Sequence, residues 1–117
     1  MDSLAAFLRS LVDAAPQLEA TLLEHKRANR GRVLSHVFMG DVTRFVIEHA
    51  SDPSYEAVLV ELIGKLETGL REGSDQVKEL VLASFVENLA GETNRLDALQ
   101  RFMGPHLKAL TDDVRGE

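Results

Sequence analysis

The segment 75–89 is the part of this chain that most restricts how it can fold. Read as a helix, it carries apolar side chains around most of its circumference, at Val77, Leu80, Val81, Leu82, Phe85, Val86 and Leu89. A surface helix needs only one apolar stripe, whereas a helix that is apolar on most sides belongs in the interior. We therefore expect this segment to lie in the middle of a helical bundle.

Apolar residues at helical spacing predict six other helices, over residues 4–14, 16–30, 34–50, 53–71, 93–103 and 105–114. Glycine or proline separates most of them, and Asp52-Pro53 is typical of a cap followed by proline at the first helical position. No stretch alternates apolar and polar residues for long enough to form a strand. The predicted fold class is all-α, a compact bundle of about six to seven helices. Because 117 residues suffice for one core, we expect a single helical domain over residues 1–117.

The spacing also predicts which side chains of two helices face the core. The apolar face of helix 16–30 consists of Leu18, Leu22 and Leu23. The wider apolar face of helix 34–50 consists of Val37, Phe38, Val42, Phe45 and Val46. Gly31 is expected to end the first of these helices, Gly40 could interrupt the second, and Gly91 is expected to end the segment 75–89.

Helices 53–71 and 75–89 are joined by a turn so short that they must fold back antiparallel. An outer helix, a tight turn and an apolar inner helix resemble one repeat of a HEAT array. No second copy occurs at a fixed period, so we expect a compact bundle that contains one HEAT-like antiparallel helix pair.

The charge of the chain is unevenly distributed. Residues 1–32 hold five Lys and Arg against four Asp and Glu, about +1, and residues 33–117 hold eight against fifteen, about −7. An acidic body disfavours nucleic-acid binding and suits a basic protein partner. The absence of cysteine excludes disulfides and thiolate metal sites. Neither a signal peptide nor a membrane span is apparent, so we expect a cytoplasmic protein with no membrane contact.

Two charged clusters are candidate contact surfaces. Carboxylates surround the turn between helices 53–71 and 75–89, at Glu67, Glu72, Asp75 and Glu79. They could meet a cationic partner surface, and plain solvated surface is the alternative. The basic run 25–32 could hold a phosphate or an acidic partner, or could simply complement the dipole at a helix C-terminus.

A further set of polar residues lies within apolar stretches, at His36, Asp41, Arg44, Glu87 and Asn88. Asp41 and Arg44 are three residues apart and can pair on one helical face. Because polar groups among apolar neighbours need partners, we expect a structural network that ties helix 34–50 to helix 75–89. The alternative is an active site formed by the first three of these residues.

Motifs for catalysis are absent from the sequence, which contains no glycine-rich phosphate loop, no His-Glu-x-x-His and no nucleophile elbow. Ser84 lies among apolar residues, and we expect its hydroxyl to bond the carbonyl one turn back. The histidines lie on four different predicted helices, at His25, His36, His49 and His106. We therefore expect no enzyme, no metal site and no cofactor.

Three stretches of the chain resemble a family of small bacterial all-helical proteins of uncharacterised function. They are His36-Val-Phe-Met-Gly-Asp-Val-Thr-Arg44, the turn Leu-Glu-x-Gly-Leu-x-x-Gly at Leu66–Gly73, and Ser84-Phe-Val-Glu-Asn-Leu89. The resemblance spans residues 34–90. Such small acidic proteins are often similar to immunity proteins, which neutralise a toxin from the same or a neighbouring cell. The resemblance therefore implies an interaction protein that neutralises a basic bacterial toxin domain by stoichiometric contact. The alternative is a HEAT-like regulatory or scaffold module that binds a peptide or protein partner.

Overall fold

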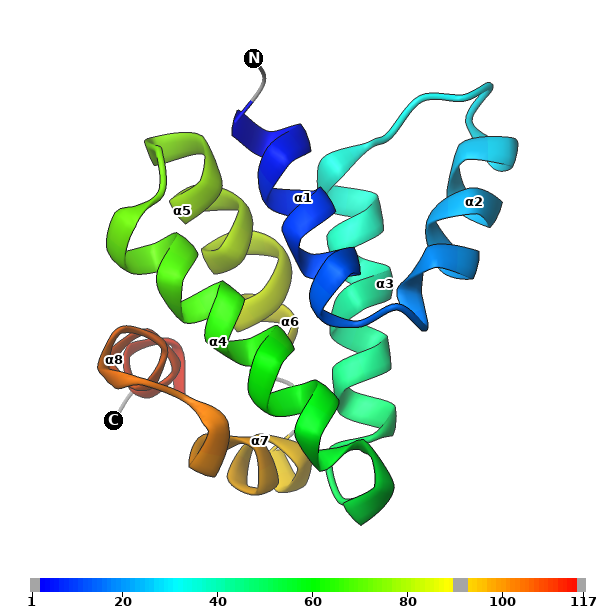
Figure 1. Ribbon diagram of the computed structural model, residues 1–117. Coiled ribbons are helices and arrows are strands. Elements are labelled where there is room, and N and C mark those ends of the chain that lie inside the picture. Colours follow the sequence, from blue (N-terminus) through cyan, green and yellow to red (C-terminus); the bar gives the residue numbers. More distant parts are fainter. Residues whose placement is uncertain (1–2, 90–92, 116–117) are drawn as a thin grey trace.

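The computed structural model describes residues 3–89 and 93–115 (Figure 1). Its helices are α1 (Ser3–Ala14), α2 (Leu18–Ala28), α3 (Ser35–Glu48), α4 (Glu56–Glu72), α5 (Asp75–Val81), the π-helical segment η2 (Leu82–Val86), α6 (Glu87–Leu89), α7 (Thr93–Leu99) and α8 (Pro105–Arg115). Short 3-10 turns precede α4 and follow α7, at Pro53–Tyr55 and Gln100–Phe102. No strand occurs in these residues, so the prediction of an all-α bundle is confirmed. None of these helices combines the length and the apolar composition that a membrane crossing requires.

The consecutive helical segments α5, η2 and α6 occupy the centre of the bundle, as expected. Leu80, Val81, Phe85 and Leu89 are completely shielded from solvent. Helices α1, α3, α4 and α8 pack around them (Figure 1). The radius of gyration of 13.4 Å is that of a compact globule of this length.

Helices α4 and α5 lie side by side, and α5 folds back along α4 (Figure 1). The Gly73 N–H donates to the carbonyl oxygen of Gly69 at 2.9 Å, which closes the last turn of α4. The Ser74 hydroxyl then accepts a hydrogen bond from the Val77 N–H at 3.3 Å and caps α5. This turn produces the predicted antiparallel pair.

Several predicted helix ends differ from the observed ones. Asp52 accepts a hydrogen bond from the Ser54 N–H at 3.0 Å, as expected of a cap, but the turn that it caps is 3-10 helical. Pro16 lies in the turn before α2 and not at its first position. Gly40 does not interrupt α3. Gly91 lies outside the described residues.

Helix α2 lies at the edge of the bundle, and its main neighbour is α3 (Figure 1). It buries Leu18, Leu22 and His25, whereas Leu23 is 51% exposed. Val37 on α3 is 55% exposed. The prediction that Leu23 and Val37 belong to buried faces is therefore wrong. Successive helical residues point about 100° apart, and a peripheral helix with one main neighbour buries only a narrow stripe.

Candidate functional site

A polar cluster lies where α3 crosses the π-helical segment η2. In a π-helical turn each backbone N–H reaches back five residues instead of four, and here the Glu87 N–H donates to the Leu82 carbonyl oxygen. The Ser84 carbonyl oxygen accepts hydrogen bonds from the Thr43 hydroxyl and from the Asn88 side-chain amide, both at 2.8 Å. Thr43 is only 1% exposed, and its one hydroxyl proton is shared between this carbonyl oxygen and that of Met39, also at 2.8 Å.

The Ser84 side chain makes a second link to α3. Its hydroxyl oxygen lies 2.6 Å from Nδ1 of His36, and either atom can be the donor. We expected this hydroxyl to bond the carbonyl one turn back in its own helix, but in the structure it pairs with a residue of another helix instead. Ser84 is buried and His36 is exposed, so the pair joins the core to the surface of α3.

The structure brings only part of the predicted polar set together. His36 and Asn88 both converge on Ser84. Asp41 and Arg44 form an ion pair with each other, three residues apart on α3, and the Arg44 side chain is 67% exposed. Glu87 is exposed on α6. Thr43 belongs to the cluster but was not predicted, although a lone hydroxyl in an apolar helix face is a signal that could have found it.

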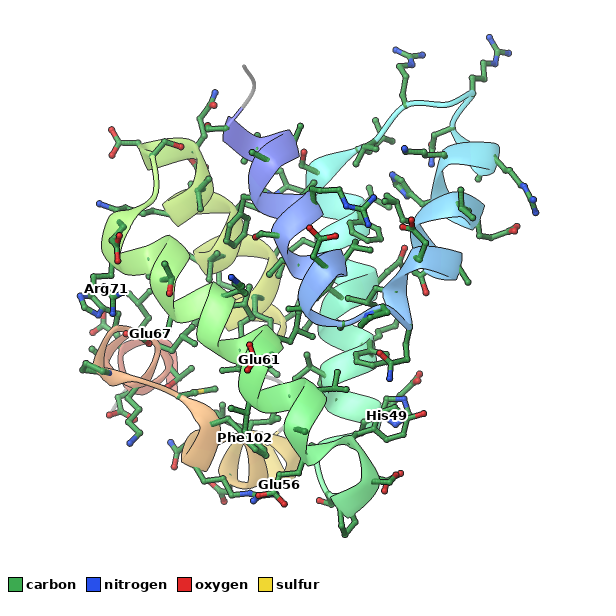
Figure 2. The ribbon with its side chains drawn as sticks, viewed as in Figure 1. His49, Glu56, Glu61, Glu67, Arg71 and Phe102 are labelled. Carbon is green, nitrogen blue, oxygen red and sulfur yellow. The ribbon has the colours of Figure 1, made fainter. Side chains whose placement is uncertain are left out.

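Glu67 does not lie on the acidic surface predicted for it. It is 8% exposed and points from α4 toward α8 (Figure 2). Its carboxylate accepts hydrogen bonds from the backbone N–H groups of His106 and Leu107, both at 2.9 Å, and lies 2.7 Å from Nδ1 of His106. These N–H groups belong to the first turn of α8, whose preceding residue, Gly104, has no side chain to cap it. Glu67 therefore caps α8 and is largely buried beneath it.

The pKa of Glu67 is lowered by its role as a cap of α8. Burial by itself would raise the pKa, but the hydrogen bonds from the Leu107 and His106 N–H groups and the contact with the His106 ring outweigh it and lower the pKa below its ordinary value of 4.5. The carboxylate is therefore held in its ionised form by α8.

The other predicted carboxylates remain on the surface. Glu72 pairs with Arg71, its neighbour in sequence, at 2.6 Å. Asp75 and Glu79 are exposed on α5. Because Glu67 is buried and Glu72 is paired with Arg71, the surface around the turn between α4 and α5 is less strongly anionic than the sequence suggests.

The histidines are also separate in space. His25 is buried, and its Nε2 accepts a hydrogen bond from the Leu34 N–H at 2.9 Å. His49 stacks on Tyr55, with ring centroids 3.8 Å apart. Within residues 3–89 and 93–115, no three His, Asp or Glu side chains come together in a way that could hold a metal ion.

A surface that the sequence did not predict lies on the arm, which we define as residues 18–34, comprising α2 and the loop that joins it to α3. Among the side chains whose exposure the structure describes, five large apolar ones are exposed, and four of them lie on the arm or in the next turn: Leu23, Val33, Leu34 and Val37. We call these four residues the arm face. The fifth, Val60, lies on α4.

Hollows flank the arm on several sides. One of about 180 Å³ lies between α1 and α2 and includes Val33 in its lining. A second of about 570 Å³ lies between α2 and α3 and includes Val37. A third of about 260 Å³ lies at the loop and includes Arg30, Arg32 and Leu34. Side chains that end in nitrogen atoms project from this loop away from the bundle (Figure 2).

The model of the family described as "Domain of unknown function (DUF7674)" matches residues 8–116. The chain belongs to this family. The DUF7674 match extends well beyond the residues 34–90 over which the motifs resemble a known family, and it includes both the polar cluster and the arm. No curated protein and no solved structure matches the chain.

Proposed function

We propose that this DUF7674 chain is a protein-interaction module that binds its partner through the arm face. The observation that carries the proposal is the gathering of four exposed large apolar side chains on and beside one peripheral helix. Exposed large apolar side chains are unfavourable in water, and several of them gathered around one element can mark a place where another molecule binds. The hollows beside α2 would let a partner side chain enter and not only rest on the surface.

We propose further that the partner is a bacterial toxin domain, which the chain neutralises in the cytoplasm by stoichiometric contact. The resemblance of the motifs to small immunity-like proteins supports this proposal. The formal net charge of −6 also supports it, because an acidic protein associates faster with a basic partner. Glu72, Asp75 and Glu79 would contribute to that attraction from the surface beside the helix pair.

The test is co-expression of the chain with the product of the adjacent gene. The expected result is a complex of one copy of each protein, measured by size exclusion with light scattering, together with relief of the toxicity of the partner. If no complex forms and no toxicity is relieved, the toxin proposal fails. Capture of several unrelated partners instead would favour the HEAT-like scaffold alternative.

Two matched variants test the binding face. Val37→Asp and Val60→Asp make the same change at valines of similar exposure, 55% and 51%, on different helices. Val37→Asp should abolish the complex, because it places a charge within the arm face, and Val60→Asp should leave it intact. Equal behaviour of the two variants would show that the arm face is not the binding surface.

A further inference from the structure

The hollow between α2 and α3 and the hollow at the loop adjoin at the end of α2, and we call the two together the groove. Both are lined by Ala28 and Asn29, at the end of α2. Val37 provides exposed apolar surface in the first hollow, and Leu34 does so in the second. The groove therefore follows α2 from Ala20 to its end and reaches the loop.

The charges of this groove are arranged asymmetrically. Its two carboxylates are already paired within the chain: Glu24 with Arg27 at 3.7 Å, and Asp41 with Arg44. At the loop end, Arg30 and Arg32 are both exposed, and in the part of the chain that the structure describes neither forms an ion pair. The groove thus offers apolar surface along its length and two uncompensated cations at its end.

Arg30 occupies a backbone conformation that its side chain disfavours. Its φ is +57°, and no other described residue except a glycine has a positive φ. The Gly31 N–H donates to the Lys26 carbonyl oxygen at 2.7 Å, which is the bond of a helix-ending Schellman motif with Arg30 at the left-handed position. Glycine is the usual residue there, because it has no Cβ to strain. The fold does not require an arginine at this position, so its presence points to a role outside the fold.

The loop that carries these arginines is held in place before any partner binds. The Leu34 N–H donates to Nε2 of the buried His25, and the Asn29 side-chain amide donates to the His25 carbonyl oxygen at 2.8 Å. A surface that is already ordered loses less conformational entropy on binding than a flexible one.

We infer that the groove between α2, α3 and the loop binds an acidic amphipathic segment of the partner protein, with apolar side chains over Leu34 and Val37 and carboxylates against Arg30 and Arg32. This inference rests on the proposed function, and it names the chemistry of the partner segment that the arm recognises. A partner that is basic overall satisfies it if the contacting segment is acidic.

The test uses fluorescent amphipathic helical peptides and the full chain, with binding measured by anisotropy. The first peptide has leucine on one face and glutamate on the other, the second has lysine in place of every glutamate, and the third has serine in place of every leucine. Only the first should bind, and its affinity should fall as salt is raised, because exposed ion pairs are screened. Failure of the first peptide to bind, or equal binding of the second, would overturn the inference.

Variants of the chain locate the site of binding. Arg30→Gly should weaken binding of the first peptide about twofold to fivefold, as expected for loss of one exposed ion pair. Its thermal stability should be unchanged or raised, because glycine suits the turn. Adding Arg32→Gln should weaken binding further, and Val37→Asp should abolish it, whereas Val60→Asp should have no effect. Binding that is insensitive to both arginine substitutions would overturn the inference.

Other occupants of the groove give different results. A concentration-dependent dimer of the chain that Val37→Asp dissociates would show that a second copy covers the groove. Direct binding of fluorescent single-stranded DNA that depends on the same arginines, without binding of the first peptide, would assign the groove to nucleic acid. Either result overturns the inference. A complex with the adjacent gene product that is sensitive to Val37→Asp but insensitive to the arginine substitutions would support the proposed function. It would overturn only the inference that the partner segment in the groove is acidic.

Discussion

Replacing Glu67 should weaken the attachment of α8 to α4 and lower the free energy of unfolding. Glu67→Ala removes the acceptor for the N–H groups of His106 and Leu107 and the partner of the His106 ring. Loss of a capping side chain lowers the free energy of unfolding by about 1 kcal/mol. The Leu107 N–H lies at a fully buried residue, and leaving such a donor unpaired lowers it by about 1–3 kcal/mol more. The expected loss is about 2–4 kcal/mol.

The assay is urea unfolding followed by circular dichroism, with thermal unfolding in parallel. In a domain of this size 1 kcal/mol corresponds to about 4 °C, so the melting temperature should fall by about 8–16 °C. Glu61→Ala is the matched control, because Glu61 is an exposed glutamate on the same helix (Figure 2). It should change the free energy of unfolding by no more than about 0.5 kcal/mol. Equal stability of the two variants would refute the role of Glu67 as a cap.

The same carboxylate makes stability depend on acidity. Folding lowers the pKa of Glu67 from its ordinary value of 4.5, so the ionised form contributes stability above that pH and the contribution is lost as the pH falls through the lowered pKa. The difference in stability between the wild type and Glu67→Ala should therefore be constant near neutrality and should shrink below a pH of about 4.5. A difference that stays constant down to strongly acidic pH would contradict this assignment.

Three further substitutions are tested by the same unfolding measurement. Gly104→Ala places a methyl carbon 2.6 Å from the carboxyl carbon of Glu67 and should cost about 1–3 kcal/mol, and an unchanged stability would show that the carboxylate has room to move. Thr43→Val keeps the shape of the side chain but removes the hydroxyl that donates to the Ser84 carbonyl oxygen. The free energy of unfolding should fall by about 1 kcal/mol, because the Asn88 side-chain amide still donates to that oxygen. Arg44→Ala breaks only an exposed ion pair and should cost less than about 0.5 kcal/mol, and a larger loss would place the arginine in a structural network after all.

The helical architecture was predictable because it depends on local signals. Helical spacing of apolar residues and the placement of proline and glycine define the helices to within a few residues, and the apolar circumference of 75–89 identifies the central segment. Local spacing is a poor guide, however, to how much of each face another element covers. Leu23 and Val37 continue apolar runs that include buried neighbours, yet both are exposed, because α2 lies at the edge of the bundle.

The chemistry of individual polar residues depends on partners that are distant in sequence. Glu67 lies in a charged stretch typical of surface, and it is buried only because α8, some 39 residues later, returns to it. Ser84 is joined to His36 and Thr43, which are 48 and 41 residues away. No local pattern indicates that η2 is π-helical.

The π-helical segment also restricts how the length of the chain can vary. A π-helical turn holds one residue more than the α-helical turn that it replaces. Deleting one residue within 82–86 would leave a regular α-helix, but it would rotate everything after the deletion by about 100° relative to everything before it. Leu80 before the segment and Leu89 after it face the same core only with the extra residue in place. A single-residue deletion in this stretch would therefore have to be balanced by an insertion before the end of α6.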